Sequence, residues 1–239
     1  KGIKQMGKYK LLGIGTNAKT IKGDGSEYLT AILYMAPHRN IEGINFCPMA
    51  EIAKCAKACL YSAGRGKFNS VIAARTRKAM LYRDDLTQFE DFLISDLIKF
   101  SSYCIKKSIT PVVRLNGTTD ANYLKIIRMF PEIQFYDYTK VYNRATKRLP
   151  KNYHLTLSYS EANMAYADKV IFVAKRMNKN VAVVFKDKNN IPKKFLGMPV
   201  IDGDKDDLRF LDPSDKPHVI ALYAKGDAKK DTTGFVVHN

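Results

Sequence analysis

The stretch PVVRLNGTTDANYLKIIRMFPEIQFYDY, residues 111–138, decides the fold class. It begins with an apolar, β-branched run, continues with a helical pattern of apolar residues, and finishes with a second apolar run rich in aromatic residues. The two outer runs are typical of buried strands, and the middle one is typical of a helix that packs against them. The stretch therefore predicts a strand, a helix and a second strand that pairs in parallel with the first.

The same alternation continues towards the C-terminus. Short apolar runs separated by helix-sized intervals are the pattern of βα units in a parallel sheet that is buried on both faces. Further strands are expected within residues 153–160, 169–174, 181–185, 198–201 and 218–224, and a helix within 161–167. We therefore expect an α/β fold whose largely parallel sheet forms a closed or incomplete (β/α) barrel, with an open, doubly wound sheet as the alternative.

Residues 1–110 follow a different pattern. Two strands are expected at residues 9–15 and 27–35, paired as a hairpin through the Gly- and Asp-rich connection 16–26. Two helices are expected at 70–82 and 85–107, and Asp85 begins the second with the residues of an N-terminal cap.

The chain shows no internal repeat and no linker long enough to divide it. Its 239 residues are within the size range of one hydrophobic core. We therefore expect a single domain, 1–239, in which residues 1–110 supply the hairpin and a helical, cysteine-bearing layer and residues 110–239 supply the βα units.

Three of the four cysteines occur within thirteen residues of the segment NFCPMAEIAKCAKACLYSAGRG, residues 45–66. Cys55 and Cys59 are four residues apart, so on a helix they would share one face. Cys47 precedes a proline, which is favoured in the first turn of a helix, so it would lie just before that helix. Three such thiolates predict a site for zinc or for an iron–sulfur cluster with one open iron.

Two readings of these cysteines stay open. A structural zinc ion needs four ligands, and His38 or Cys104 would supply the fourth. Alternatively, the thiols are small core residues, because cysteine is among the most buried residue types.

Polar residues follow several of the expected strands, and ligands of parallel α/β folds bind at these carboxyl ends. Asp120 and Asp137 lie there, and the acidic turn DGDKDD at 202–207 supplies Asp202 and Asp204. These four carboxylates are the candidate catalytic groups, for acid/base or nucleophilic work, and the acidic turn is also a candidate magnesium site. The structural alternatives are a helix cap for Asp120 and a solvated turn for 202–207.

Lys and Arg outnumber Asp and Glu by 40 to 23, which gives a net charge of +17. Such an excess favours polyanionic partners, although a Lys-rich surface from a genome biased towards A and T would give the same balance. The segment TKVYNRATKRLPK, residues 139–151, combines basic side chains with an aromatic ring and no acid, and the turn 62–67 places basic residues beside glycines. The candidate nucleic-acid-binding residues are Arg65, Lys67, Lys140, Tyr142, Arg144, Lys147 and Arg148.

Several blocks of the sequence together resemble a family of bacteriophage and plasmid proteins of the gene-product-eighty-eight type. The blocks are CPMAEIAKCAKACLYSAGRG, VRLNGTTD, FYDYTKVYNR, DGDKDDLRFLDP and AKGDAKKDTTGFV, and the resemblance spans roughly residues 30–238. It implies a phage or mobile-element origin and that the blocks converge in space. It implies no particular activity.

The cysteine spacing is also similar to the cluster motif of radical S-adenosylmethionine enzymes, which use α/β barrels. The gaps differ, because they contain seven and three residues here and three and two in that family.

The sequence therefore favours a phage-type, nucleic-acid-binding metalloprotein that acts on DNA or RNA, with base or nucleotide modification by a transferase or hydrolase as the expected activity. One alternative is a non-catalytic nucleic-acid-binding protein used in phage replication or host takeover. The other is a radical S-adenosylmethionine-like iron–sulfur enzyme that acts on a small metabolite. No run of about 18 apolar residues occurs, so we expect no membrane contact and a cytoplasmic location with reduced thiols.

Overall fold

The computed structural model describes residues 10–14, 27–59, 61 and 63–239. Ten strands form one sheet in the order β1-β2-β3-β4-β5-β6-β9-β8-β7, and β10 lies beside β6. Neighbouring strands from β2 to β8 along this path are parallel, whereas β1 and β7 are antiparallel to their partners. The strands are β1 (Leu12–Ile14), β2 (Tyr28–Leu33), β3 (Thr110–Arg114), β4 (Gln134–Thr139), β5 (Tyr153–Ser158), β6 (Val181–Phe185), β7 (Lys194–Phe195), β8 (Met198–Asp202), β9 (Val219–Tyr223) and β10 (Val236–Val237).

The α/β fold and the largely parallel sheet are confirmed. Strand order is consecutive from β2 to β6, as in a barrel built of βα units. Within the described part of the chain no ladder joins the β1 end of the sheet to the β7 end, so the sheet corresponds to an incomplete barrel or an open sheet. One continuous sheet contains strands from both the N-terminal and the C-terminal part of the chain.

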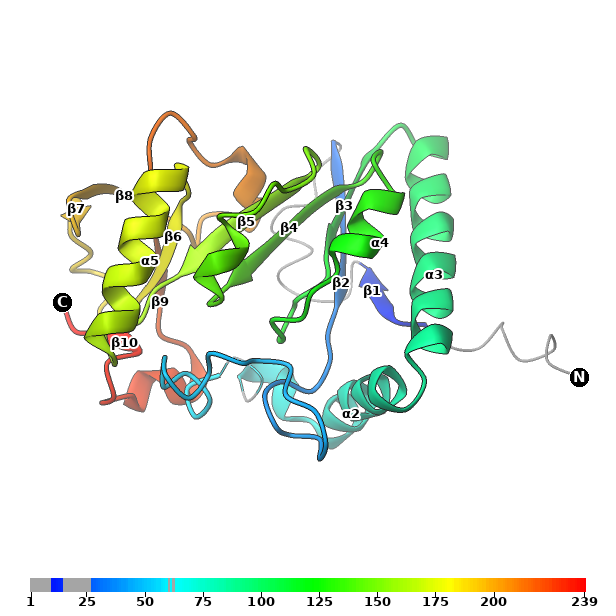
Figure 1. Ribbon diagram of the computed structural model, residues 1–239, viewed down its shortest axis with the longest axis horizontal. Coiled ribbons are helices and arrows are strands. Elements are labelled where there is room, and N and C mark those ends of the chain that lie inside the picture. Colours follow the sequence, from blue (N-terminus) through cyan, green and yellow to red (C-terminus); the bar gives the residue numbers. More distant parts are fainter. Residues whose placement is uncertain (1–9, 15–26, 60, 62) are drawn as a thin grey trace, which may run out of the picture.

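Helices cover one face of the sheet (Figure 1). α3 (Leu86–Lys106) and α4 (Leu124–Met129) pack over β2 to β5, α5 (Met164–Met177) packs over β5, β6 and β9, and α2 (Asn69–Asp84) leads into α3. The amphipathic pattern of α3 explains its position, because Phe89, Leu93 and Leu97 recur at helical spacing and are buried in the core. No helix among the described residues is both long and apolar enough to cross a membrane.

The expected hairpin is confirmed, since β1 and β2 pair antiparallel with Leu12 opposite Leu33. β2 also pairs in parallel with β3, so the hairpin is part of the main sheet. Asp85 caps α3 as predicted, because its carboxylate accepts a hydrogen bond from the backbone N–H of Gln88 at 2.9 Å. The expected connection 16–26 lies outside the described residues.

Two expectations about local structure are wrong. Residues 169–174 belong to α5 instead of forming a strand, because the buried positions of this segment recur at helical spacing. The cysteine-bearing segment is a series of turns instead of a regular helix: a helical turn at 49–53 ends where Lys54 adopts a positive φ of 52°. Cys55 and Cys59 therefore do not share a helix face.

The face of the sheet opposite the helices has a different composition, because alternate side chains of a strand point to opposite faces. Val113 and Phe135 are buried with the helices, so their neighbours Arg114 and Tyr136 face the other side. There the segment between β8 and β9 covers the sheet and packs Leu208 on Val112 and Tyr136. This segment contains the short 3-10 helix η4 (Arg209–Leu211).

β5 and β6 separate towards their carboxyl ends. Only Leu157 and Ser158 of β5 pair with β6, and further along β6 its partner is β10. The loop after β2, α2 and the segment that precedes β10 gather at these strand ends, at the bottom of the view in Figure 1. The separation of two neighbouring parallel strands is where ligand sites of such sheets form.

Substitution of Gly117 tests the packing at this edge. A Cβ added there would lie 2.6 Å from the Tyr34 ring and 2.8 Å from Ile32 Cγ2. We expect Gly117→Ala to lower the free energy of unfolding by about 1–3 kcal/mol, because the buried site cannot take another methyl group. Urea unfolding measures the loss. In the double variant with Tyr34→Ala the loss should be smaller than the sum of the two single losses, and an additive result would contradict the predicted contact.

Candidate functional site

Two cavities lie at opposite edges of the parallel sheet. The first, of about 240 Å³, opens at the carboxyl ends of the strands, and we call it the cysteine cavity. The second, of about 470 Å³, lies at the amino ends of β4 and β5, and we call it the lysine cavity. The residues of the cysteine cavity used below are Cys47, Cys55, Cys59, Arg114, Asp120, Tyr138, Lys140, Asp204 and Asp207.

All three cysteines of the turn segment line the cysteine cavity. Hydrogen bonds tie this segment to the strand ends: Asp120 N–H donates to Phe46 O at 2.9 Å, and Ser160 Oγ donates to Ala53 O at 2.8 Å. The Cys47 thiol itself lies 4.0 Å from Thr118 O. Tertiary contacts therefore bring the three sulfur atoms to one cavity although no helix aligns them.

The environment of the Cys47 and Cys59 thiols raises their pKa and so favours the protonated form when no cation is present. Burial raises the pKa of Cys47 to about 12 and also raises the pKa of Cys59. Backbone N–H groups oppose this effect: His38 N–H donates to Cys47 Sγ at 3.3 Å, and Tyr61 N–H donates to Cys59 Sγ at 3.5 Å. Such N–H···S bonds also stabilise thiolates that bind a metal.

The expected fourth zinc ligands do not join this group. Cys104 is fully buried in α3 within the main core, and His38 Nε2 lies 3.0 Å from Glu51 Oε1. Among the residues that the structure describes, no three His, Cys, Asp or Glu side chains stand in an arrangement ready to hold a metal ion. A three-thiolate site would therefore need the turn segment to move.

Asp120 lines the cysteine cavity but is occupied by protein partners. Its carboxylate accepts hydrogen bonds from Thr139 Oγ1 at 2.8 Å and from Lys140 N–H at 2.9 Å, and it forms an ion pair with Arg144 at 2.6 Å. Arg144 Nη2 also donates to the Asp120 carbonyl at 2.7 Å. Through these contacts Asp120 joins the loop after β3 to the end of β4, which indicates a structural role.

Asp137 is 1% exposed and faces the helical core. It accepts hydrogen bonds from Asn116 N–H at 2.8 Å, Asn116 Nδ2 at 3.2 Å and Tyr153 Oη at 3.3 Å. Burial raises its pKa to about 7, although the charge of Arg114 acts in the opposite direction. Asp137 does not line the cysteine cavity, so its contacts indicate a structural role.

The acidic turn contributes one of its two candidate residues. Asp204 lines the cysteine cavity, accepts a hydrogen bond from Tyr223 N–H at 3.1 Å and forms an ion pair with Lys225. Asp202 is exposed, and its carboxylate accepts a hydrogen bond from Asp204 N–H at 2.9 Å. The two carboxylates therefore have different surroundings.

The candidate nucleic-acid-binding residues lie in separate places. Arg65 and Lys67 are exposed on the 3-10 helix η2 (Gly64–Lys67). Lys140 points into the cysteine cavity, where its Nζ donates to Ser158 Oγ at 2.9 Å. Tyr142 packs beside Tyr166 with ring centroids 6.1 Å apart. Arg144 is paired with Asp120, Lys147 lines the lysine cavity, and Arg148 is exposed.

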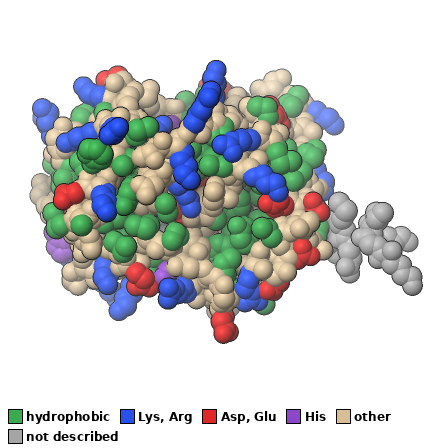
Figure 2. Space-filling model, viewed as in Figure 1, with side chains coloured by type: hydrophobic (Ala, Val, Ile, Leu, Met, Phe, Trp, Pro, Cys, Tyr) green, Lys and Arg blue, Asp and Glu red, His purple; other side chains and the backbone are tan. Residues whose placement is uncertain are grey.

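Figure 2 shows Lys and Arg side chains dispersed among apolar and neutral ones over one face of the molecule. A turn at residues 142–145 divides the basic segment, which explains why neighbours in sequence face different surroundings. The structure thus does not gather the seven candidates into one patch.

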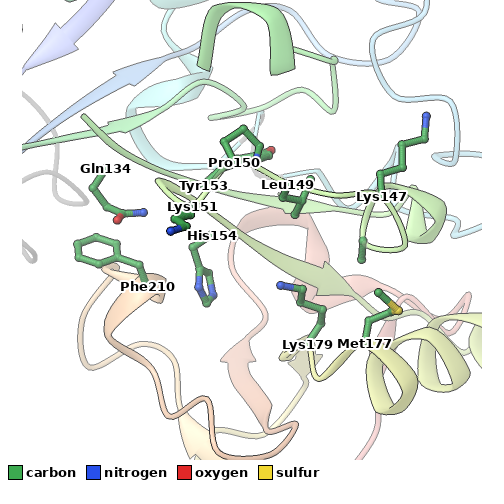
Figure 3. A pocket seen from close by; sticks show the side chains of 11 residues that line it. Gln134, Lys147, Leu149, Pro150, Lys151, Tyr153, His154, Met177, Lys179 and Phe210 are labelled. Carbon is green, nitrogen blue, oxygen red and sulfur yellow. The ribbon is translucent and has the colours of Figure 1, made fainter. Parts of the chain in front are cut away.

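The lysine cavity collects basic side chains from the segments that precede β5 and β6 (Figure 3). Lys147, Lys151 and Lys179 line it, and none of its described lining residues is acidic. His154 also lines it, and burial followed by the charge of Lys179 lowers the pKa of this imidazole to about 4, so the ring is neutral at pH 7.

A protein-family model described as gene product 88 matches residues 9–239. The chain belongs to the gene product 88 family. No curated protein and no solved structure matches the chain. The family identity confirms the resemblance drawn from the sequence blocks. The blocks also converge in space, because all five contribute residues to the cysteine cavity, the block DGDKDDLRFLDP through Asp204 and Asp207.

Sequence reasoning missed one residue of this site, Arg114. It is 6% exposed, lines the cysteine cavity and lies over the Tyr138 ring, with its guanidinium carbon 4.8 Å from the ring centroid. Its Nε and Nη1 atoms have no hydrogen-bond partner among the described residues. Its position within the apolar strand PVVRL is the signal that could have identified it, because a charged side chain is rarely buried in a central strand unless it has a partner.

The raised pKa of Asp137 predicts a pH dependence of stability. An aspartate with an ordinary pKa of 3.8 in the unfolded chain and about 7 in the folded chain stabilises the fold at low pH, and this contribution is lost as the pH rises through 7. Relative to the native chain, Asp137→Asn should therefore gain stability between pH 4 and 7, by on the order of 4 kcal/mol. Urea unfolding of both proteins at several pH values measures this gain in the free energy of unfolding. Asp91→Asn, an exposed change on α3, should show no such gain, and parallel curves for all three proteins would contradict the prediction.

Proposed function

We propose that this protein is an iron–sulfur enzyme in which Cys47, Cys55 and Cys59 hold a cluster at the carboxyl edge of the sheet. The observation that carries the proposal is that all three thiols, from a segment without regular helix, line one cavity at this edge. Ligand sites of parallel α/β folds occupy the same position.

The donor set favours a cluster over a structural zinc ion. A structural zinc site is closed by four protein ligands, and the candidates for the fourth ligand are buried elsewhere or paired. Three cysteines leave one iron of a cluster open to a ligand, and the adjoining cavity supplies the space for it. Backbone N–H groups already point at two of the three sulfur atoms.

The place of the cysteines in the chain supports the same class. They follow β2, the first of the consecutive parallel strands, as the resemblance to radical S-adenosylmethionine enzymes implies. Such a cluster, when bound, supplies one-electron chemistry, and the protein supplies binding and orientation. Arg114, Lys140 and Asp207 line the cavity and would orient a polar substrate beside the cluster.

Iron and acid-labile sulfide in anaerobically purified or reconstituted protein test this proposal. We expect iron and sulfide in the native chain, with release of protons on binding because the raised pKa values of Cys47 and Cys59 keep these thiols protonated beforehand. Cys47→Ala, Cys55→Ala and Cys59→Ala should each reduce the iron content to background. Cys104→Ala, in the core, is the matched control and should retain it. Equal iron in all four variants, or bound zinc alone, would contradict the proposal.

A second candidate function is binding of nucleic acid at the lysine cavity. Three lysines line it without a neighbouring carboxylate among its described residues, and Phe210 and Tyr153 add aromatic rings. Clustered positive charge beside rings suits phosphate neutralisation with base stacking. On this view, the basic charge of the chain acts at the edge of the sheet opposite the cysteines.

Salt-dependent binding of a fluorescent single-stranded oligonucleotide tests the second function. The variant with Lys147, Lys151 and Lys179 all changed to Gln should reduce the slope of log K against log salt by roughly 0.7 for each lost contact. A control in which exposed Lys99 and Lys106 of α3 and Lys107, directly after it, are changed to Gln removes the same charge. Equal slopes for the two triple variants would show that only net charge matters and would overturn this function.

A further inference from the structure

Arg114 is a buried cation that forms no ion pair with any residue that the structure describes. Its side chain is 6% exposed, and two of its nitrogen atoms, Nε and Nη1, have neither solvent nor a hydrogen-bond partner within the described residues. A guanidinium remains protonated at any physiological pH, so this charge cannot be removed by titration. Burying it without a partner is costly, and a fold retains such a group when something else completes its hydrogen bonds.

The neighbouring carboxylates do not meet this need. No ion pair within 4.0 Å joins Arg114 to an acid in the described chain, Asp120 is paired with Arg144, and Asp204 is paired with Lys225. Asp137 accepts its hydrogen bonds from Asn116 and Tyr153 on the helical side. The Tyr138 ring covers one face of the guanidinium, which leaves the edge for an acceptor.

Strand β3 fixes where this charge lies. Arg114 ends the strand, between the buried residues Val113 and Leu115, so its direction is set by the alternation of the sheet. Its side chain therefore stays on the wall of the cysteine cavity, on the face opposite the helices. Lys140 contributes a second positive charge to the same cavity.

We infer that the cysteine cavity binds a small ligand that carries a carboxylate or phosphate group, and that Arg114 receives this group. The inference deepens the proposed function, since it rests on the cavity being the ligand site of that enzyme, and it names the class of ligand. Carboxylate and phosphate share the oxygen geometry that a guanidinium binds best. The cavity volume of about 240 Å³ limits the ligand, or the part of it that enters, to a small molecule.

Titration with inorganic phosphate and with succinate, at constant ionic strength set by chloride, tests the inference. Thermal unfolding reports binding, because a ligand of the native state raises the Tm. The native chain should bind at least one of the two anions with a Kd below roughly 10 mM. Arg114→Met should weaken this binding at least tenfold, and Arg128→Met, which removes an exposed arginine from α4, should not. The anion that binds more tightly shows whether the natural group is a phosphate or a carboxylate.

Chemical modification of the native chain keeps the test valid if Arg114→Met does not fold. The bound anion should protect Arg114 from phenylglyoxal, measured by peptide mass spectrometry, while Arg128 reacts at an unchanged rate. Absence of binding by both anions, equal binding by both arginine variants, or absence of protection at Arg114 would overturn the inference.

Iron measured in the same samples separates this inference from the proposed function. Anion binding that depends on Arg114 in a protein that takes up no iron supports the anion site and rejects the iron–sulfur enzyme. Iron bound by the three cysteines without any anion binding gives the opposite result.

Discussion

The alternation of side chains along the central parallel strands is the constraint on which the site depends. Val113 and Phe135 must face α3 and α4 to complete the main core. The pleat then places Arg114, Tyr136 and Tyr138 on the opposite face, whatever their cost there. The position of the polar side chains at the cysteine cavity thus follows from the packing of the apolar side chains in the core. A register shift of one residue would disrupt both the core and the cavity.

A small set of hydrogen bonds converts this sheet edge into a cavity. Asp120 joins the loop after β3 to Thr139, Lys140 and Arg144 at the end of β4. Its backbone N–H also bonds to Phe46 O, directly before Cys47. Asp120 therefore connects both strand ends to the cysteine segment. Its ion pair with Arg144 helps to fix the position of the thiols.

The electrostatics of the cysteine cavity point to ligands that are charged. Burial disfavours the thiolates of Cys47 and Cys59, so a cation that binds there must compete with protons. The Nε and Nη1 atoms of Arg114 are buried without a hydrogen-bond partner among the described residues, so an anion that binds there would complete their hydrogen bonds. The two proposals together describe a substrate whose anionic group binds Arg114 beside the proposed cluster. The lysine cavity, at the other edge of the sheet, has charge of a single sign and suits a partner that is anionic throughout.

The α/β class, the hairpin, the cap at Asp85, the family and the grouping of the cysteines could all be predicted from the sequence. Each of them depends on residue patterns within short segments of the chain. A strand at 169–174 and a helix carrying Cys55 and Cys59 were predicted wrongly, since short apolar runs fit more than one kind of local structure and only packing decides. The sequence could not show that Asp120 pairs with Arg144 or that Asp137 faces the core. The division of the basic segment, and the cavity that Arg114 shares with the three thiols, likewise emerge from tertiary contacts. These relations join residues up to about 70 positions apart through the register of parallel strands, and such a register is set by the burial of all the strands together.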